Sequence, residues 1–419
     1  MKVLLFILIT IILGGCATRQ DDSIHTIKFS EAFANVDEIM LSEYVSSLEY
    51  TPIETHPNAL LGNIHDNCSI DDNFMYFPSG KEQATIHMFG RDGTYIKDIG
   101  RKGRGPGEFL AIAFITTIPE SNILVVKGGP IILFYSLDDG KCLKQFNIED
   151  LFERSNDMIF NTKGMTYTRS NTAMGNIVFH NNLFYITVAD NTTFNQTLII
   201  LDNNLNIKSM IDIGETCYTI GFPVADAGYV YISNDKVNVV RGVIDTIYTI
   251  ESNELIPQLV FDHTPYPTKK NDPIKEYRGY YKKHNIMRMR DMIEFTKVHI
   301  SNKSVLVGSI YPPSSVSASL ITKTHRFAYI LYDKKTRKTK IIKPSEHLGQ
   351  AAFTNDIDGG MPFWPSKQIG NKLYQFVDAV TFIEMSKKYN SPRMKEIAST
   401  LTDESNPVLI EATLKNSLD

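Results

Sequence analysis

The segment Asn355–Gly360 (NDIDGG) carries the residue types best suited to bind a ligand. Asp356 and Asp358 place two carboxylates two residues apart, with an amide before them and glycines after them. Oxygen donors in this arrangement can bind Ca²⁺ or sugar hydroxyl groups, although Lys367 stands where an EF-hand loop has its closing glutamate. Trp364, the only tryptophan, follows closely and could stack on a sugar ring. The alternative is a turn whose Asp side chains accept local backbone hydrogen bonds, with Trp364 packed between structural elements.

A second candidate is the glycine-rich basic stretch 100–109, GRKGRGPGEF. Arg101 and Arg104 could form an anion site, because the neighbouring glycine amides are free to approach a ligand. The alternative is a connection between two strands, shaped by the glycines and Pro106, in which Glu108 pairs with an arginine. The stretch lacks the GxGxxG pattern and a following helix, which argues against dinucleotide binding.

Recognisable catalytic signatures are absent from the sequence. It contains no HExxH, GxSxG or GxxxxGK[ST] motif, and no two of its ten histidines are four residues apart. We therefore predict no catalytic residue, and the metal-ligand set stays unknown. Cys68, Cys142 and Cys217 show no metal-binding spacing, which indicates buried thiols or one disulfide with a remaining thiol.

The first residues have the pattern of a bacterial export signal. Lys2 provides a positive charge, and the apolar run 3–13 is too short to span a bilayer as a helix. The run ends in Leu-Gly-Gly-Cys16, which resembles a lipobox, whereas the alternative is an ordinary signal peptide with a chance cysteine. We expect a signal peptide over 1–15, lipidation at Cys16 and a tether over 16–30. The expected location is the cell envelope of a Gram-negative bacterium, anchored by lipid to the outer membrane, on its periplasmic or surface face.

Pairs of β-branched or aromatic runs joined by polar turns recur down the chain. They fall at 85–99, 131–148, 197–213, 246–261 and 327–342, each after a further strand-like run. About six units of four short antiparallel strands predict an all-β, six-bladed β-propeller occupying residues 31–419 as a single domain. The strand-like segment 47–55 has no partner nearby, so we expect it to pair with 408–414 and close the ring.

Two segments interrupt this repeat. Asp272-Pro273 begins a basic, helix-like stretch that extends to about Lys297, either a ligand-facing lid or an insertion packed on one rim. The net charge of −4 and the export signal argue against nucleic acid as its partner. Residues 379–400 resemble two short helices outside the ring, separated by Ser391-Pro392.

Several segments together resemble the bacterial six-bladed β-propeller lipoproteins, a family of largely unknown function that is distantly similar to NHL-repeat propellers. They are GRKGRGPGEF after DGTYIKDIG, 245–248, 355–360 with 363–365, and 403 with 406–409. The resemblance covers nearly all of the chain after the signal. It implies the fold, and it supplies no catalytic residues.

We therefore expect a non-catalytic binding or scaffold protein for a glycan, a peptide or an outer-membrane protein partner, attached to the membrane by its lipid. Asp356, Asp358 and Trp364 are the first candidates for the ligand site, and Arg101 and Arg104 the second. No cofactor is expected, with Ca²⁺ as the one candidate. The alternative is a metal-dependent hydrolase or lyase with its site in the central channel. That enzyme would use Asp356, Asp358 and a histidine such as His180 or His65.

Overall fold

The computed structural model describes residues 24–62, 64, 68–79, 84–128, 131–147, 172–190, 194–216, 226–241, 245–266, 293–317, 320, 327–345 and 351–415. The export signal with Cys16, residues His65 and Cys217, and most of the basic segment lie outside this part of the chain. The predictions made for them therefore stay predictions.

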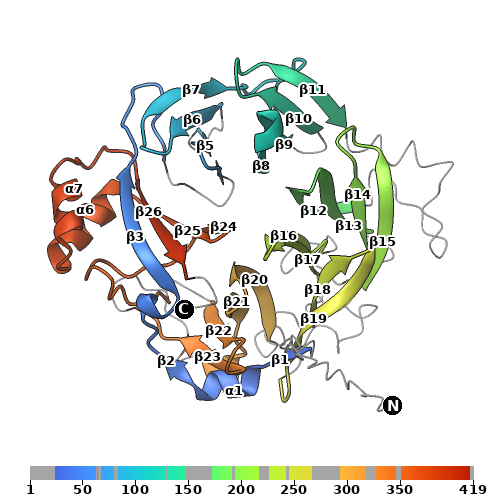
Figure 1. Ribbon diagram of the computed structural model, residues 1–419, viewed down its shortest axis with the longest axis vertical. Coiled ribbons are helices and arrows are strands. Elements are labelled where there is room, and N and C mark those ends of the chain that lie inside the picture. Colours follow the sequence, from blue (N-terminus) through green and yellow to red (C-terminus); the bar gives the residue numbers. More distant parts are fainter. Residues whose placement is uncertain are drawn as a thin grey trace, which may run out of the picture.

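The described residues form six sheets, each with four antiparallel strands, arranged as blades around a central axis (Figure 1). The first strand of each blade lies toward the axis and the fourth lies at the perimeter. Blade 1 contains β4 (Ser69–Ile70), β5 (Phe74–Pro78), β6 (Ile86–Gly90) and β7 (Tyr95–Ile99). Blade 2 contains β8 (Phe114–Ile118), β9 (Ile123–Gly128), β10 (Ile131–Ser136) and β11 (Cys142–Asn147). Blade 3 contains β12 (Thr172–His180), β13 (Leu183–Asp190), β14 (Asn195–Leu201) and β15 (Ile207–Glu215).

The other three blades repeat this order. Blade 4 contains β16 (Tyr229–Ser233), β17 (Lys236–Val240), β18 (Thr246–Glu251) and β19 (Glu254–Asp262). Blade 5 contains β20 (Glu294–Ser301), β21 (Val305–Tyr311), β22 (Ala328–Asp333) and β23 (Lys338–Ile342). Blade 6 contains β24 (Lys367–Ile369), β25 (Lys372–Val377), β26 (Val408–Leu414) and β3 (Val45–Pro52). The predicted six-bladed propeller of four-stranded blades is confirmed.

Blade 6 confirms the predicted closure of the ring. Its outer strand β3 comes from the N-terminal part of the chain and pairs antiparallel with β26, so that Tyr50 faces Ile410. The tight turn at Gly93 fits against the end of β3, because a Cβ on Gly93 would lie 2.2 Å from the carbonyl oxygen of Pro52. Gly93 also has a φ of 89°, which a glycine adopts without strain.

The segment before β3 runs along the perimeter of blades 4 and 5, which the sequence did not reveal. Strand β1 (His25–Lys28) pairs parallel with β19, and β2 (Val36–Asp37) pairs parallel with β23. Helix α1 (Phe29–Ala34) joins the two strands (Figure 1). Residues 25–30, which we placed in the tether, therefore form β1 and the beginning of α1. Burial explains why this segment has regular structure, because Ile27 and Phe29 are fully buried in the core between these blades.

The helices predicted near residues 379–400 are present, whereas the C-terminal end of the predicted basic helix is a strand. Helices α6 (Ala379–Lys388) and α7 (Pro392–Ala398) lie at the perimeter of blade 6, as expected (Figure 1). The basic helix was predicted to reach Lys297, but that prediction is wrong at its C-terminal end, because 294–301 is β20. Short helical turns also occur at η1 (Leu41–Glu43), η2 (Pro119–Ser121) and α5 (Ser314–Ser317).

The apolar side chains pack between neighbouring blades. Phe134 of blade 2 lies edge-on to Phe184 of blade 3, with ring centroids 6.0 Å apart. Phe261 of blade 4 and Phe295 of blade 5 approach to 4.5 Å. Each strand thus buries side chains toward both neighbours, which explains the nearly continuous apolar runs in the second and third strands.

Candidate binding site

The two ends of the propeller are built from different loops. Because strands alternate in direction, the turns between first and second strands, and between third and fourth strands, lie at one end. We call this end the turn face. The connections from one blade to the next lie at the opposite end, which we call the connection face. The sequence-predicted loops 100–109 and 355–360 are both parts of blade-to-blade connections, but loop 355–360 extends back along the perimeter, because Asp356 accepts from Ser42 just before β3 begins.

A pocket of about 610 Å³ opens at the turn face. Its lining comes from the turns that join the first and second strands of blades 3 to 6, together with the end of β26. The lining residues are His180, 232–235, 301–303, Gln368 with Gly370 and Asn371, and Leu414 with Lys415. We call it the axial pocket, because the first strands of these blades lie nearest the propeller axis (Figure 1).

Hydrogen bonds between blades hold the base of the axial pocket. The Ser233 hydroxyl donates to the carbonyl oxygen of Ser301 at 2.8 Å and so joins blade 4 to blade 5. The Gln368 carboxamide accepts from Ser301 N–H at 2.8 Å and donates back to the Ser301 carbonyl at 3.0 Å, which joins blade 6 to blade 5. These polar atoms are occupied, so the base is a rigid frame and the rim carries the groups available to a ligand.

The turn at Asn302 is fixed from two directions. Its side-chain oxygen accepts from the backbone N–H groups of Ser304 and Val305 at 2.8 and 2.9 Å. The Lys334 ammonium donates to the Asn302 carbonyl oxygen at 2.5 Å. Burial lowers the pKa of Lys334 to about 8, because the charged amine is removed from water.

His180 brings blade 3 to the rim. Its Nε2 is 3.1 Å from the carbonyl oxygen of Asp235 and 3.5 Å from the Asp235 carboxylate. Asn181 Nδ2 approaches the same nitrogen at 3.0 Å. His180 was named only for the enzyme alternative, yet it is the sequence-predicted residue that lines this pocket. Asn234, Asn302, Lys303 and Asn371 were missed; their only sequence signal is their place in short polar turns between strands.

The two predicted carboxylates have partners within the fold. The Asp356 carboxylate accepts from the Ser42 N–H at 2.9 Å and from the Ser42 hydroxyl at 2.5 Å. Slight burial acts to raise the pKa of Asp356, but the hydrogen bonds from Ser42 outweigh it and the pKa lies below its usual value. Asp356 thus ties the last blade-to-blade connection to η1.

Asp358 accepts hydrogen bonds from more groups than Asp356 does. Its Oδ1 accepts from Asn355 Nδ2 at 2.7 Å, from Gly360 N–H at 3.0 Å and from the Tyr50 hydroxyl at 3.2 Å. Its Oδ2 accepts from the Ser391 hydroxyl at 2.7 Å, and Ser391 caps α7. Burial first, and the nearby Asp358 charge second, raise the pKa of Tyr50 well above its usual value. The NDIDGG loop therefore joins β3, α7 and its own turn.

The other three predicted site residues also lie apart from the axial pocket. Trp364 is 6% exposed and packs against Tyr329, with ring centroids 4.1 Å apart, and against His299. Arg101 Nε donates to Glu108 at 2.6 Å, and Arg104 is exposed in the same loop. Ligand binding by these five residues stays a prediction, and the structure does not bring them together in one site.

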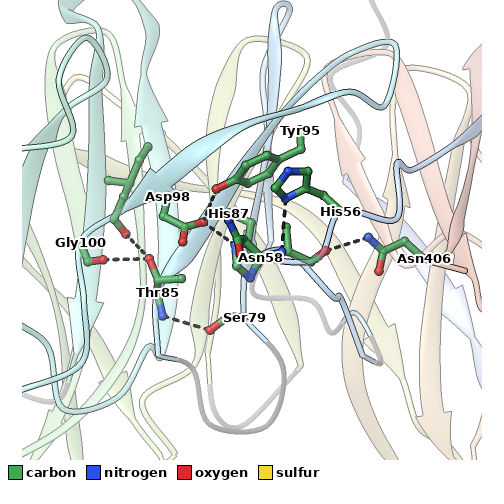
Figure 2. Close-up of polar contacts among 11 residues, drawn as sticks. His56, Asn58, Ser79, Thr85, His87, Tyr95, Asp98, Gly100 and Asn406 are labelled. Carbon is green, nitrogen blue, oxygen red and sulfur yellow. Dashed lines mark hydrogen bonds and ion pairs between the residues drawn. The ribbon is translucent and has the colours of Figure 1, made fainter. Parts of the chain in front are cut away.

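A buried histidine in blade 1 forms a separate polar network (Figure 2). His87 is 3% exposed, and its Nδ1 lies 2.6 Å from Asp98 Oδ1. The Tyr95 hydroxyl donates to the same carboxylate oxygen at 3.0 Å, and the His56 ring stacks on Tyr95 at 4.3 Å. Burial, followed by the bond to Asp98, raises the pKa of Tyr95 to about 12. The network fastens the connection from blade 6 to blade 1.

The described part of the chain has three further features. It contains no group of three or more His, Cys, Asp or Glu side chains placed to hold a metal ion. Cys68 and Cys142 are thiols rather than disulfide partners. No helix within the described ranges is long and apolar enough to cross a membrane.

The fold defines the class of this protein as a six-bladed β-propeller, with a recess at one end of the ring that is lined by turn residues. The chain belongs to the family described as "Domain of unknown function (DUF4934)", whose model matches residues 24–413. A search of curated proteins found no match.

One solved structure is similar over the whole ring. It is described as a "Putative exported protein" from Bacteroides fragilis, with a TM-score of 0.64 and 14% identity. The match covers 94% of this chain and 100% of that chain. At this identity the likeness shows the fold alone. A luciferin-regenerating enzyme matches with a TM-score of 0.39 and 11% identity, covering 89% of this chain and 96% of that chain. This similarity is too low to support a conclusion about function.

Proposed function

We propose that this propeller is a non-catalytic binding protein of the bacterial cell envelope that holds a glycan in its axial pocket. The observation that carries the proposal is the rim of the pocket, where three carboxamides, two lysines and a His180–Asp235 pair meet in one recess. Carboxamide and charged side chains hydrogen-bond to hydroxyl-rich ligands, and a volume near 610 Å³ is within the range of small-ligand pockets.

The shape of the recess favours a glycan over a peptide. Its lining comes from turns gathered near the axis, which form a compact recess rather than an extended groove or a sheet edge. Ile232, 42% exposed, offers an apolar contact of the kind that the C–H face of a sugar ring requires. A folded partner protein would need a much larger contact surface, on the order of 800 Å² on each side.

The proposed location at the outer membrane follows from the export signal in the sequence. In this proposal Cys16 carries the lipid and the protein is attached to the outer membrane. The similar Bacteroides fragilis structure, described as exported, is consistent with a protein that leaves the cytoplasm. Labelling with radioactive palmitate, compared between the native chain and Cys16→Ser, tests the anchor. If both chains label equally, or neither does, the anchor is wrong.

The binding role is tested with the full mature chain on a printed glycan array, followed by isothermal titration calorimetry on each glycan retained. Asn371→Trp fills the rim of the pocket, while Glu254→Trp alters an exposed residue at the start of β19, at the perimeter of blade 4, and serves as the control. Binding that is lost only with Asn371→Trp supports the proposal. An array without any retained glycan, or binding indifferent to Asn371→Trp, contradicts it.

A further inference from the structure

The rim of the axial pocket offers more hydrogen-bond donors than acceptors. Asn302 uses its side-chain oxygen to hold its own turn, so its amide N–H groups are what it can offer a ligand. Gln368, in the base, adds neither a donor nor an acceptor, because its oxygen is engaged by Ser301 and its nitrogen by Ser301 and Gly370. Lys303 is exposed on the same turn as Asn302 and makes no ion pair within the described residues.

The charges at the rim also favour a ligand that accepts hydrogen bonds and carries negative charge. Lys303 and Lys415 bring two positive charges, and Asp235 brings one negative charge. The Asp235 side chain is 88% exposed and lies beside His180. Lys415 also lies within the field of Asp356, which makes Lys303 the cation least engaged elsewhere. The pocket is thus locally positive in a chain whose net charge is −4, and such a recess favours an anionic ligand.

We infer that the glycan held in this pocket is acidic, and that a carboxylate on a sugar ring is bound by Lys303 and the Asn302 amide. The inference rests on the proposed glycan-binding function and specifies its ligand. The Asp235 carboxylate, whose side chain is 88% exposed beside His180, is then available for the hydroxyl groups of the same or the next sugar. A carboxylate gains charge-assisted hydrogen bonds from this arrangement, whereas a neutral sugar leaves the Lys303 ammonium without a counter-charge.

The test compares acidic glycans with neutral forms of the same glycans. Uronate-containing oligosaccharides from pectin, alginate and heparosan are printed beside their carboxyl-reduced counterparts, together with a triglutamate peptide. The full mature chain is compared with Lys303→Ala, Lys303→Glu and the control Lys338→Ala, an exposed lysine of β23 outside the pocket. Substitution of exposed side chains leaves the fold intact, so changes report on binding.

We expect uronate forms to be retained and reduced forms to be lost. Lys303→Ala is expected to weaken uronate binding roughly tenfold, because one charge-assisted hydrogen bond is removed. Lys303→Glu is expected to weaken it further, and Lys338→Ala to leave it unchanged. Raising the ionic strength should weaken binding by the native chain more than by Lys303→Ala.

Other outcomes separate this inference from the proposed function. Equal retention of acidic and reduced glycans, lost in Asn371→Trp, overturns the acidic-ligand inference and leaves glycan binding in place. No retention of any glycan on the full array overturns both. Retention of triglutamate without any glycan shows that the pocket binds acidic peptides, and it also overturns the inference.

Discussion

The Asp358 carboxylate accepts hydrogen bonds from four groups, so its main role is predicted to be structural. Asp358→Ala removes the acceptor of Tyr50, Gly360 and Ser391, and we expect the free energy of unfolding to fall by about 1–3 kcal/mol. Asp358→Asn retains one acceptor oxygen and should lose less. Urea denaturation measures both. If Asp358→Ala keeps full stability and instead abolishes glycan binding, the sequence-based prediction of a ligand site in this loop is correct.

Lys334 gives the stability of the protein a specific pH dependence. Its pKa in the folded state is about 8, below its ordinary value of 10.5, because the amine is buried. Between these two pH values the unfolded chain binds more protons than the folded chain, so the free energy of unfolding rises with pH. The burial penalty is fully present below pH 8 and is removed as the pH approaches 10.5.

Lys334→Met removes this titration and provides the test. The difference in unfolding free energy between the native chain and the variant should shift in favour of the native chain as the pH is raised from 7 to 10. Taking the difference cancels the buried tyrosines, which titrate in both proteins. A difference that is constant across this range would show that Lys334 keeps an ordinary pKa.

At the scale of elements, the perimeter segment made of β1, α1 and β2 should contribute to stability through buried side chains rather than through the few backbone hydrogen bonds of its strands. Phe29, fully buried, stacks on Phe261 of β19 with ring centroids 5.7 Å apart. Phe29→Ala is expected to cost about 3–5 kcal/mol. Val36→Ala, on a side chain 42% exposed in β2, should change stability by less than about 0.5 kcal/mol. Thermal unfolding of both variants checks this, and equal melting temperatures would refute it.

The same elements show where sequence reasoning succeeded. Hairpins such as β6–β7 were predictable because alternating apolar residues flank a turn, Asp92-Gly93, that has one favoured geometry. Strands β1 and β2 were not, because they span four and two residues and pair in parallel with edges formed elsewhere. Lys297 was assigned to a helix because basic residues continue up to it, whereas burial of Phe295 and Ile300 determines β20. Tertiary burial therefore overrode local propensity in these places.

The axial pocket belongs to the whole molecule and was the least predictable feature. His180, Asn234, Asn302 and Asn371 come from four different blades, and each looks like an ordinary residue of a polar turn. Only closure of the ring brings the turns together. The NDIDGG loop was predicted to be a ligand site because its polar residues are adjacent in sequence. Adjacency also allows these residues to form hydrogen bonds with one another, which occupies their donors and acceptors. His180 was the one residue named from the sequence that the fold places at this rim.

Closure of the ring is itself open to test. Blade 6 is completed by β3 and β26, and Glu411 of β26 contacts Arg91 of blade 1 and lies 2.7 Å from Lys372. Ending the chain after Asn406 removes β26, separates β3 from β25 and exposes unpaired strand edges, which promote association between chains. We expect this shortened chain to elute as aggregates in size-exclusion chromatography and to lose glycan binding, because Leu414 and Lys415 leave the pocket.

The matched control ends after Lys415, just beyond the end of β26 at Leu414. This chain keeps the β3–β26 pairing and every described residue of the pocket lining, so it should elute and bind as the full chain does. Because the six blades share one closed ring, we expect the loss of a single strand to disturb the pocket at its far side as well. Unchanged binding by the chain ending after Asn406 would show instead that five blades suffice to hold the pocket.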